Sequence, residues 1–118
     1  MSDYLRTPAM SEMYKAYRAG GALDGACVLC GESALEMFSL WKVITNKFPY
    51  DMLAAVHTML IPLRHTTEAG LTNAERAELV TIKASYAQEY DYIIEATTRT
   101  KSIPQHFHLH LIKGKVIG

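Results

Sequence analysis

The sequence predicts an α+β fold in which an antiparallel sheet is packed with one long helix. Residues 106–112 alternate histidine with apolar residues (His-Phe-His-Leu-His-Leu-Ile), and this period of two is typical of a half-buried strand. Residues 71–90 instead space their apolar side chains as a helix does. Aromatic and β-branched segments lie on both sides of that helix, without the strand–helix–strand rhythm of a parallel sheet.

The N-terminal half predicts a short helix followed by two strands. Residues 7–8 (Thr-Pro) are typical of a helix start and residues 20–21 (Gly-Gly) of a helix end, and we expect the Met and Tyr side chains between them to lie in the core. Residues 36–45 and 57–61 are rich in aromatic and β-branched residues and predict strands. The intervening residues 46–51 predict a turn.

The long helix begins at a capping box. Thr72 is the expected N-cap, and Glu75 follows three positions later, where its carboxylate can reach back to the helix start. The periodicity continues for about 17 residues to Tyr90. Residues 92–97 then predict a strand and residues 98–104 a polar loop.

Length and charge restrict the class of protein. The 118 residues are 49% hydrophobic and show no linker or repeat, so a single domain over residues 1–118 is expected. Twelve basic residues balance twelve acidic residues, which argues against a nucleic-acid or membrane-surface partner. The sequence has neither an apolar run of about 20 residues nor the pattern of a signal peptide, so a cytoplasmic location is expected.

The histidine triplet is the main candidate site. His106, His108 and His110 would share one face of a strand, because strand side chains alternate. Three neighbouring imidazoles cannot all be charged, so at least one should be neutral at pH 7, as a ligand or nucleophile requires. The alternative is an ordinary strand that carries histidine on its solvent face.

Both cysteines lie in one Cys-x-x-Cys knuckle, at Cys27 and Cys30. In a reducing compartment this spacing indicates half of a metal site or a redox pair. The glycines on both sides do not provide the strand-to-helix context of a redox motif. Zinc would need two further ligands, for which the histidines are the obvious source.

These motifs together resemble the histidine triad (HIT) family. Residues 106–112 fit its His-φ-His-φ-His-φ-φ pattern, in which φ is apolar, at every position. The upstream segment from His57 to His65 and the cysteine knuckle also resemble family features, so the resemblance spans residues 27–112. It implies a HIT-like fold and a nucleotide phosphohydrolase or nucleotidyl transferase that acts at the α-phosphate.

The resemblance also implies a structural zinc site. Its ligands would be Cys27, Cys30, His65 and His106, a closed set of two cysteines and two histidines with no position left for substrate. The alternative is that the cysteines are merely buried and that His65 is an ordinary turn residue.

Catalytic roles follow from the same resemblance. His108 matches the nucleophile that forms a covalent nucleotidyl-histidine intermediate, and His110 matches the histidine that donates to the phosphate oxygens. His57 matches the upstream histidine that helps to position the phosphate, and Asn46 the residue that binds the ribose hydroxyls.

The loop before the triplet departs from the family pattern. Residues 102–105 (Ser-Ile-Pro-Gln) replace the usual Ala-Gly-Gln-Ser, which leaves Ser102 and Gln105 as candidate phosphate contacts. This loop is closer to that of the aprataxin-like branch, so an enzyme that removes adenylate from DNA ends is one alternative, although the neutral net charge argues against it.

Two further alternatives remain at the level of sequence. The chain could be a nucleotide-binding module with vestigial catalysis, or a zinc-stabilised structural domain without either function. The resemblance also implies a homodimer that pairs through the long helix and a sheet edge.

Overall fold

The computed structural model describes residues 5–21, 27–97, 99, 103 and 105–116. A five-stranded sheet has the order β1-β2-β3-β5-β4, and every pair of neighbours is antiparallel. The strands are β1 (Glu36–Met37), β2 (Trp41–Thr45), β3 (Ala54–Pro62), β4 (Tyr92–Ile94) and β5 (Leu109–Gly114). The predicted α+β class and the antiparallel sheet are therefore confirmed.

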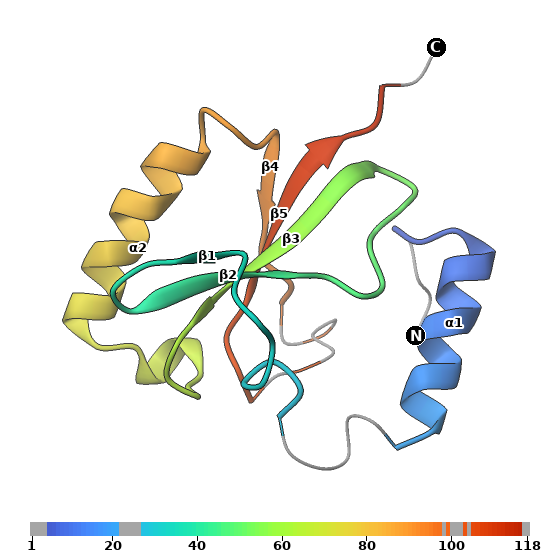
Figure 1. The fold of residues 1–118 in the computed structure, drawn as a ribbon, viewed down its shortest axis with the longest axis horizontal. Coiled ribbons are helices and arrows are strands. Elements are labelled where there is room, and N and C mark those ends of the chain that lie inside the picture. Colours follow the sequence, from blue (N-terminus) through green and yellow to red (C-terminus); the bar gives the residue numbers. More distant parts are fainter. Residues whose placement is uncertain (1–4, 22–26, 98, 100–102, 104, 117–118) are drawn as a thin grey trace.

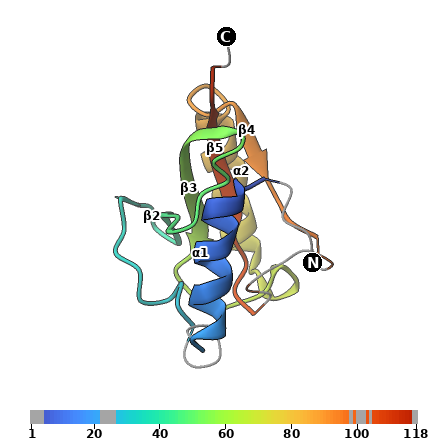
Figure 2. The ribbon, with the colours of Figure 1, turned by 90° about the vertical axis from the view of Figure 1, so that its right-hand side faces the viewer.

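Two α-helices lie on opposite sides of this sheet. Figures 1 and 2 show α1 (Pro8–Ala19) on one side and α2 (Asn73–Tyr86) on the other, with the strands between them. A short 3-10 helix, η1 (Glu68–Gly70), precedes α2. None of the helices in the described part of the chain is long and apolar enough to cross a membrane.

The N-terminal helix begins and ends where the sequence predicts. Thr7 is the N-cap and accepts a hydrogen bond from the Met10 backbone N–H at 3.3 Å, and Gly21 follows the helix with a φ of 80°, which favours glycine. The prediction that its Met and Tyr residues form core is wrong. No residue of α1 is buried, and the Met13 side chain is 58% exposed, because α1 packs against a loop instead of the sheet.

The capping box of α2 is confirmed, but the helix is shorter than predicted. The Glu75 N–H donates to Thr72 Oγ1 at 3.1 Å, and the Thr72 N–H donates to the Glu75 carboxylate at 2.7 Å. The helix ends at Tyr86 instead of Tyr90. The Asp91 N–H already donates to a carbonyl of β5 at 2.8 Å, so the intervening residues must turn the chain into the sheet.

Alternating side chains build two apolar clusters, one on each face of the sheet. The cluster facing α2 contains nine buried residues: Trp41, Val43, Leu60, Leu71, Ile82, Tyr86, Phe107, Leu109 and Leu111. The cluster on the other face contains Leu29, Ile44, Met59 and Ile61, and the cysteine knuckle packs against it. The histidines therefore lie opposite α2, because they alternate with Phe107, Leu109 and Leu111.

The last strand begins later than the sequence predicts. Strand β5 starts at Leu109, which pairs with Leu60 of β3. Just before it, the Phe107 N–H donates to the Thr66 carbonyl at 2.7 Å, in the segment that follows β3. Since β3 ends at Pro62, the chain there has left the regular ladder, and His106 lies outside the strand that carries His110.

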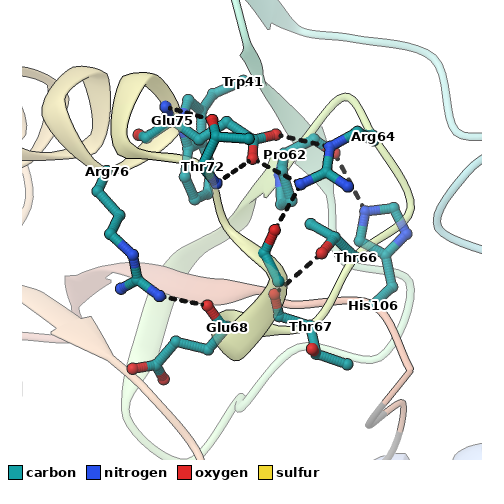
Figure 3. A network of polar contacts seen from close by, with 11 residues as sticks. Trp41, Pro62, Arg64, Thr66, Thr67, Glu68, Thr72, Glu75, Arg76 and His106 are labelled. Carbon is teal, nitrogen blue, oxygen red and sulfur yellow. Dashed lines mark hydrogen bonds and ion pairs between the residues drawn. The ribbon is translucent and has the colours of Figure 1, made fainter.

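A network of polar contacts ties the start of α2 to the segment after β3 (Figure 3). The Glu75 side chain is buried, and its carboxylate accepts from Arg64 at 2.8 Å and from the Thr72 N–H. Its backbone carbonyl accepts from the Trp41 indole N–H at 2.9 Å, and Arg64 also donates to the Gly70 carbonyl at 2.6 Å. The bond from Arg64 is the main cause that lowers the pKa of the Glu75 carboxyl group, and the bonds with Thr72 lower it as well.

We expect Glu75→Gln to lower the free energy of unfolding by about 2–4 kcal/mol, because it removes a buried charge that Arg64 and the helix cap both use. Urea denaturation at pH 7 measures this loss. The control is Glu68→Gln at an exposed position of the same region, which should change stability by less than about 0.5 kcal/mol. Equal effects of the two substitutions would contradict the role of Glu75.

Candidate active site and metal centre

Two of the three histidines in the triplet line one open pocket. This pocket lies on the sheet face opposite α2, and His108 and His110 both contribute to its wall. Leu29, Phe48 and Met59 provide apolar surface beside them. A concave, mostly apolar site with a few polar groups is the usual form of a small-molecule site.

The His108 imidazole is oriented by the backbone two residues before it. Its Nδ1 lies 2.9 Å from the carbonyl oxygen of His106. A carbonyl can only accept, so Nδ1 carries the proton in this contact. The neutral ring then has its lone pair on Nε2, which is the form that a nucleophile requires.

The protons of His57 and His110 are fixed by a chain of hydrogen bonds. The Tyr50 backbone N–H donates to His57 Nδ1 at 2.9 Å, so a neutral His57 carries its proton on Nε2. His57 Nε2 lies 2.8 Å from His110 Nδ1 and donates to it. A neutral His110 therefore carries its own proton on Nε2, which lies 3.2 Å from the Tyr50 hydroxyl.

This chain of bonds ends in a donor beside the pocket. The Tyr50 backbone holds His57 at Nδ1, and the bond from His57 to His110 Nδ1 places the proton of His110 on its Nε2. His110 Nε2–H can then donate to an anionic oxygen near His108, since the two imidazole centroids are 5.2 Å apart. His108 and His110 together combine a lone pair suited to nucleophilic attack with a hydrogen-bond donor for the developing negative charge.

Burial keeps both supporting imidazoles neutral at pH 7. Burial, followed by the charge of Arg6, lowers the pKa of His57 from 6.5 to about 4. Burial also lowers the pKa of His110 to about 2, with the neighbouring His57 as the next cause. Neutral rings are required by the chain of donors and acceptors described above.

These pKa shifts predict a loss of stability as the pH falls from 6.5 towards 4. In this range the unfolded chain binds a proton at His57 that the folded chain does not bind, so acid favours unfolding. The contribution of His57 alone reaches roughly 3 kcal/mol near pH 4. Urea denaturation at several pH values should give a shallower dependence for His57→Gln than for the wild type. The same dependence in both proteins would contradict this account.

Asn46, the residue predicted to bind the ribose, also lines this pocket. Its Oδ1 accepts from the Phe48 N–H at 2.8 Å, which fixes the orientation of the amide. Its Nδ2 lies 3.3 Å from His57 Nε2. Both of these nitrogens carry protons in the arrangement derived above, so this contact is not a hydrogen bond and the amide N–H groups can serve a ligand.

A second cluster contains the four predicted metal ligands. The ligand atoms of Cys27, Cys30, His65 and His106 all lie within 4.8 Å of one another. Cys27 Sγ is 3.4 Å from His106 Nδ1, and Cys30 Sγ is 3.2 Å from His65 Nδ1. A tetrahedral zinc ion with bonds of about 2.3 Å to sulfur and 2.0–2.1 Å to nitrogen places these atoms about 3.6 Å apart. The cluster thus has nearly the dimensions that a zinc ion requires.

The protonation of the cluster also fits a cation. His106 Nε2 lies 3.1 Å from the Pro62 carbonyl, so Nε2 carries the proton and Nδ1 is left to bind a metal. Burial lowers the pKa of His106, which favours the neutral ring. Burial raises the pKa of the Cys30 thiol, and the hydrogen bond with Cys27 and the charge of Cys27 raise it further, so the thiolate is disfavoured without a cation. A divalent ion would remove that penalty.

The triplet is thus divided between two sites. The His106 ring faces His65 in the metal cluster, whereas His108 and His110 line the pocket. Gln105 is exposed and does not line the pocket, and Ser102 lies outside the described residues. The loop prediction for residues 98–104 also falls largely outside them.

Sequence reasoning missed two residues of this pocket, Tyr50 and Arg6. Tyr50 contacts both His57 and His110 through its backbone N–H and hydroxyl. Arg6 enters the pocket from the segment before α1. The Asn-x-φ-Pro-Tyr pattern of residues 46–50 could have drawn attention to Tyr50, but no local pattern marks Arg6.

The comparisons with known proteins identify the fold. No protein-family model and no curated protein matches this sequence. Among solved structures, a HIT family hydrolase from Legionella pneumophila Philadelphia 1 is similar, with a TM-score of 0.57 and 17% identity over 78% of this chain and 96% of that chain. A HIT family hydrolase from Clostridium thermocellum Cth-393 also has a TM-score of 0.57, with 19% identity over 79% and 94% of the two chains.

A histidine triad protein from Clostridium difficile has a TM-score of 0.52, with 15% identity over 78% of this chain and 93% of that chain. The chain therefore has the fold of histidine triad proteins, as its sequence motif predicts. At these identities the likeness establishes the fold alone, so the activity must be argued from the pocket and its residues.

Proposed function

We propose that this chain is a nucleotide phosphohydrolase or nucleotidyl transferase that acts through a covalent nucleotidyl-histidine intermediate at His108. The observation that carries the proposal is the bond from His108 Nδ1 to the His106 carbonyl, because it leaves the Nε2 lone pair for attack. The likeness to solved HIT family hydrolases supports the same class of reaction.

The first step forms a bond between His108 Nε2 and the α-phosphorus and breaks the bond to the leaving group. His108 becomes an imidazolium whose proton remains on Nδ1, which still donates to the His106 carbonyl. His110 donates to the phosphate oxygens from Nε2 and stabilises their charge. The leaving group takes the electron pair of the broken bond and is protonated by solvent or by a neighbouring donor.

In the second step, water or another acceptor attacks the same phosphorus. The bond between nitrogen and phosphorus breaks, and its electron pair returns to His108 Nε2. Water gives a nucleoside monophosphate, and a different acceptor gives a transferase product. Asn46 lines the pocket, and its amide would bind the ribose hydroxyls.

The proposal also includes a structural zinc ion held by Cys27, Cys30, His65 and His106. The dimensions of the cluster and the second-shell bond to the Pro62 carbonyl support this assignment. When bound, the ion would link the knuckle before β1 to the segment before β5. It has no step in the reaction.

The proposed homodimer would use the exposed edge of β4 and the outer face of α2. Strand β4 lies at the end of the sheet order, and its Tyr92 side chain is 60% exposed. On α2, the Val80 side chain is 68% exposed. Exposed apolar groups beside an unpaired strand edge are compatible with such a pairing.

Intact mass spectrometry tests the covalent step. After rapid quenching without acid, we expect wild-type protein mixed with adenosine 5′-phosphoramidate or a dinucleoside polyphosphate to carry one added nucleotide. His57→Gln should accumulate less of this species, because His110 loses the bond that directs its proton. If neither an adduct nor turnover is found with a panel of nucleotides, the pocket is a binding module instead.

A further inference from the structure

Arg6 brings a positive charge into the pocket from outside the sheet. It lines the pocket together with His108 and His110, although it precedes α1 in the sequence. Its Nε donates to the Phe48 carbonyl at 2.8 Å. A surface arginine usually samples many rotamers, whereas this bond restrains the side chain.

The backbone on both sides of Arg6 is also held. The Met52 N–H donates to the Leu5 carbonyl at 2.9 Å. On the other side, the Thr7 N–H and hydroxyl donate to the two oxygens of the Asp51 carboxylate at 2.7 and 2.8 Å. The position of Arg6 is thus fixed against the loop between β2 and β3.

Aromatic rings complete this arrangement. The Arg6 guanidinium lies 4.4 Å from the Tyr14 ring centre and 4.9 Å from that of Tyr50. The Tyr50 ring in turn lies 4.5 Å from the His57 ring and 4.8 Å from the His110 ring. Tyr50 therefore contacts both the guanidinium and the two imidazoles.

The charged side chains that line the pocket are Arg6, Lys47 and Glu32. Lys47 and Glu32 form an ion pair at 3.3 Å and cancel each other. His57 and His110 are neutral at pH 7 because burial lowers the pKa of each. Arg6 and Lys47 are the two lysine or arginine side chains among the lining residues, and Arg6 also contacts the Tyr50 ring.

We propose that Arg6 is a specificity-determining residue that binds the phosphate chain of the substrate beyond the phosphate attacked by His108. This inference rests on the proposed function. The attacked phosphate would lie against His108 and His110, and Arg6 lines the same pocket, where it would meet the next phosphate of an anhydride. The enzyme would prefer nucleoside phosphoanhydrides, whose leaving group is a phosphate, to phosphoramidates, whose leaving group is an amine.

Steady-state kinetics with two substrates test this assignment. For Arg6→Gln, kcat/KM for diadenosine tetraphosphate should fall by about 10–100-fold, the usual effect of losing a charge-assisted hydrogen bond. The value for adenosine 5′-phosphoramidate should change by less than about twofold. Arg6→Lys should restore part of the lost activity, because it keeps the charge and loses the planar fork.

The matched control is Arg18→Gln. Arg18 also lies over the Tyr14 ring, at 5.8 Å, but it does not line the pocket, so both substrates should react at the wild-type rate. An equal loss with the two substrates in Arg6→Gln would overturn the inference, since Arg6 would then act on the attacked phosphate or on the fold. No loss with the tetraphosphate would overturn it as well.

Binding separates this inference from the proposed function. If the wild type turns over neither substrate, the proposed reaction fails, and titration calorimetry with ADP and AMP still tests Arg6. The wild type should then bind the diphosphate more tightly than the monophosphate, and Arg6→Gln should lose this preference. A wild type without such a preference would overturn the role of Arg6.

Discussion

Replacing His108 with alanine should reduce turnover of any nucleotide substrate by at least about 10³-fold and abolish the covalent adduct, because the proposed mechanism takes the attacking lone pair from this ring. Nucleotide affinity should be kept, since the apolar wall and Asn46 do not change. The main core lies on the opposite sheet face, so the fold should persist. Kinetics, calorimetry and circular dichroism on the same preparation measure the three effects.

Free imidazole provides the control for His108→Ala. The truncated side chain leaves a space beside His110 in which imidazole can attack the phosphorus in place of the missing ring. We expect turnover to recover with added imidazole while the protein itself remains free of nucleotide. Full activity of His108→Ala without imidazole would refute the assigned nucleophile.

His65→Gln should remove the metal and lower the melting temperature by at least about 10 °C, because a closed zinc site contributes to the stability of a small fold. Cys27→Ala should have the same effect. The wild type is expected to contain about one zinc ion per chain by elemental analysis. Both measurements can be made without any substrate.

His57→Gln is the control variant for His65→Gln. His57 bonds to His110 and is not one of the four clustered ligands, so His57→Gln should keep its zinc. His65 is exposed, so its loss leaves no cavity that could lower stability by itself. Unchanged zinc content in His65→Gln would show that the ligand set is wrong.

Much of the fold could be predicted from local signals. The caps at Thr7 and Thr72 depend on side-chain bonds within a few residues of each helix start, and both are present. The alternation after residue 106 correctly places Leu109 and Leu111 in the core. The end of α2 and the start of β5 were not predicted, because pairing with distant segments sets them.

Of the residues predicted for the pocket, His108, His110 and Asn46 line it, but their arrangement and the presence of Arg6 were not predicted. The spacing of the triplet suggests three histidines side by side, whereas the turn after β3 directs the His106 ring to the metal cluster. The bond that orients His108 involves a main-chain carbonyl, which carries no sequence signal. Arg6 reaches the pocket only through the packing of its segment on a loop more than forty residues away.

His106 belongs to both sites at once. Its ring contributes Nδ1 to the metal cluster, and its carbonyl oxygen accepts the hydrogen bond from Nδ1–H of His108, the proposed nucleophile. A change at this one position, or loss of the ion that its ring would bind, should therefore alter heat tolerance and reactivity together. In directed evolution, position 106 should behave as pleiotropic, so that improving one trait there without harming the other requires compensating changes elsewhere.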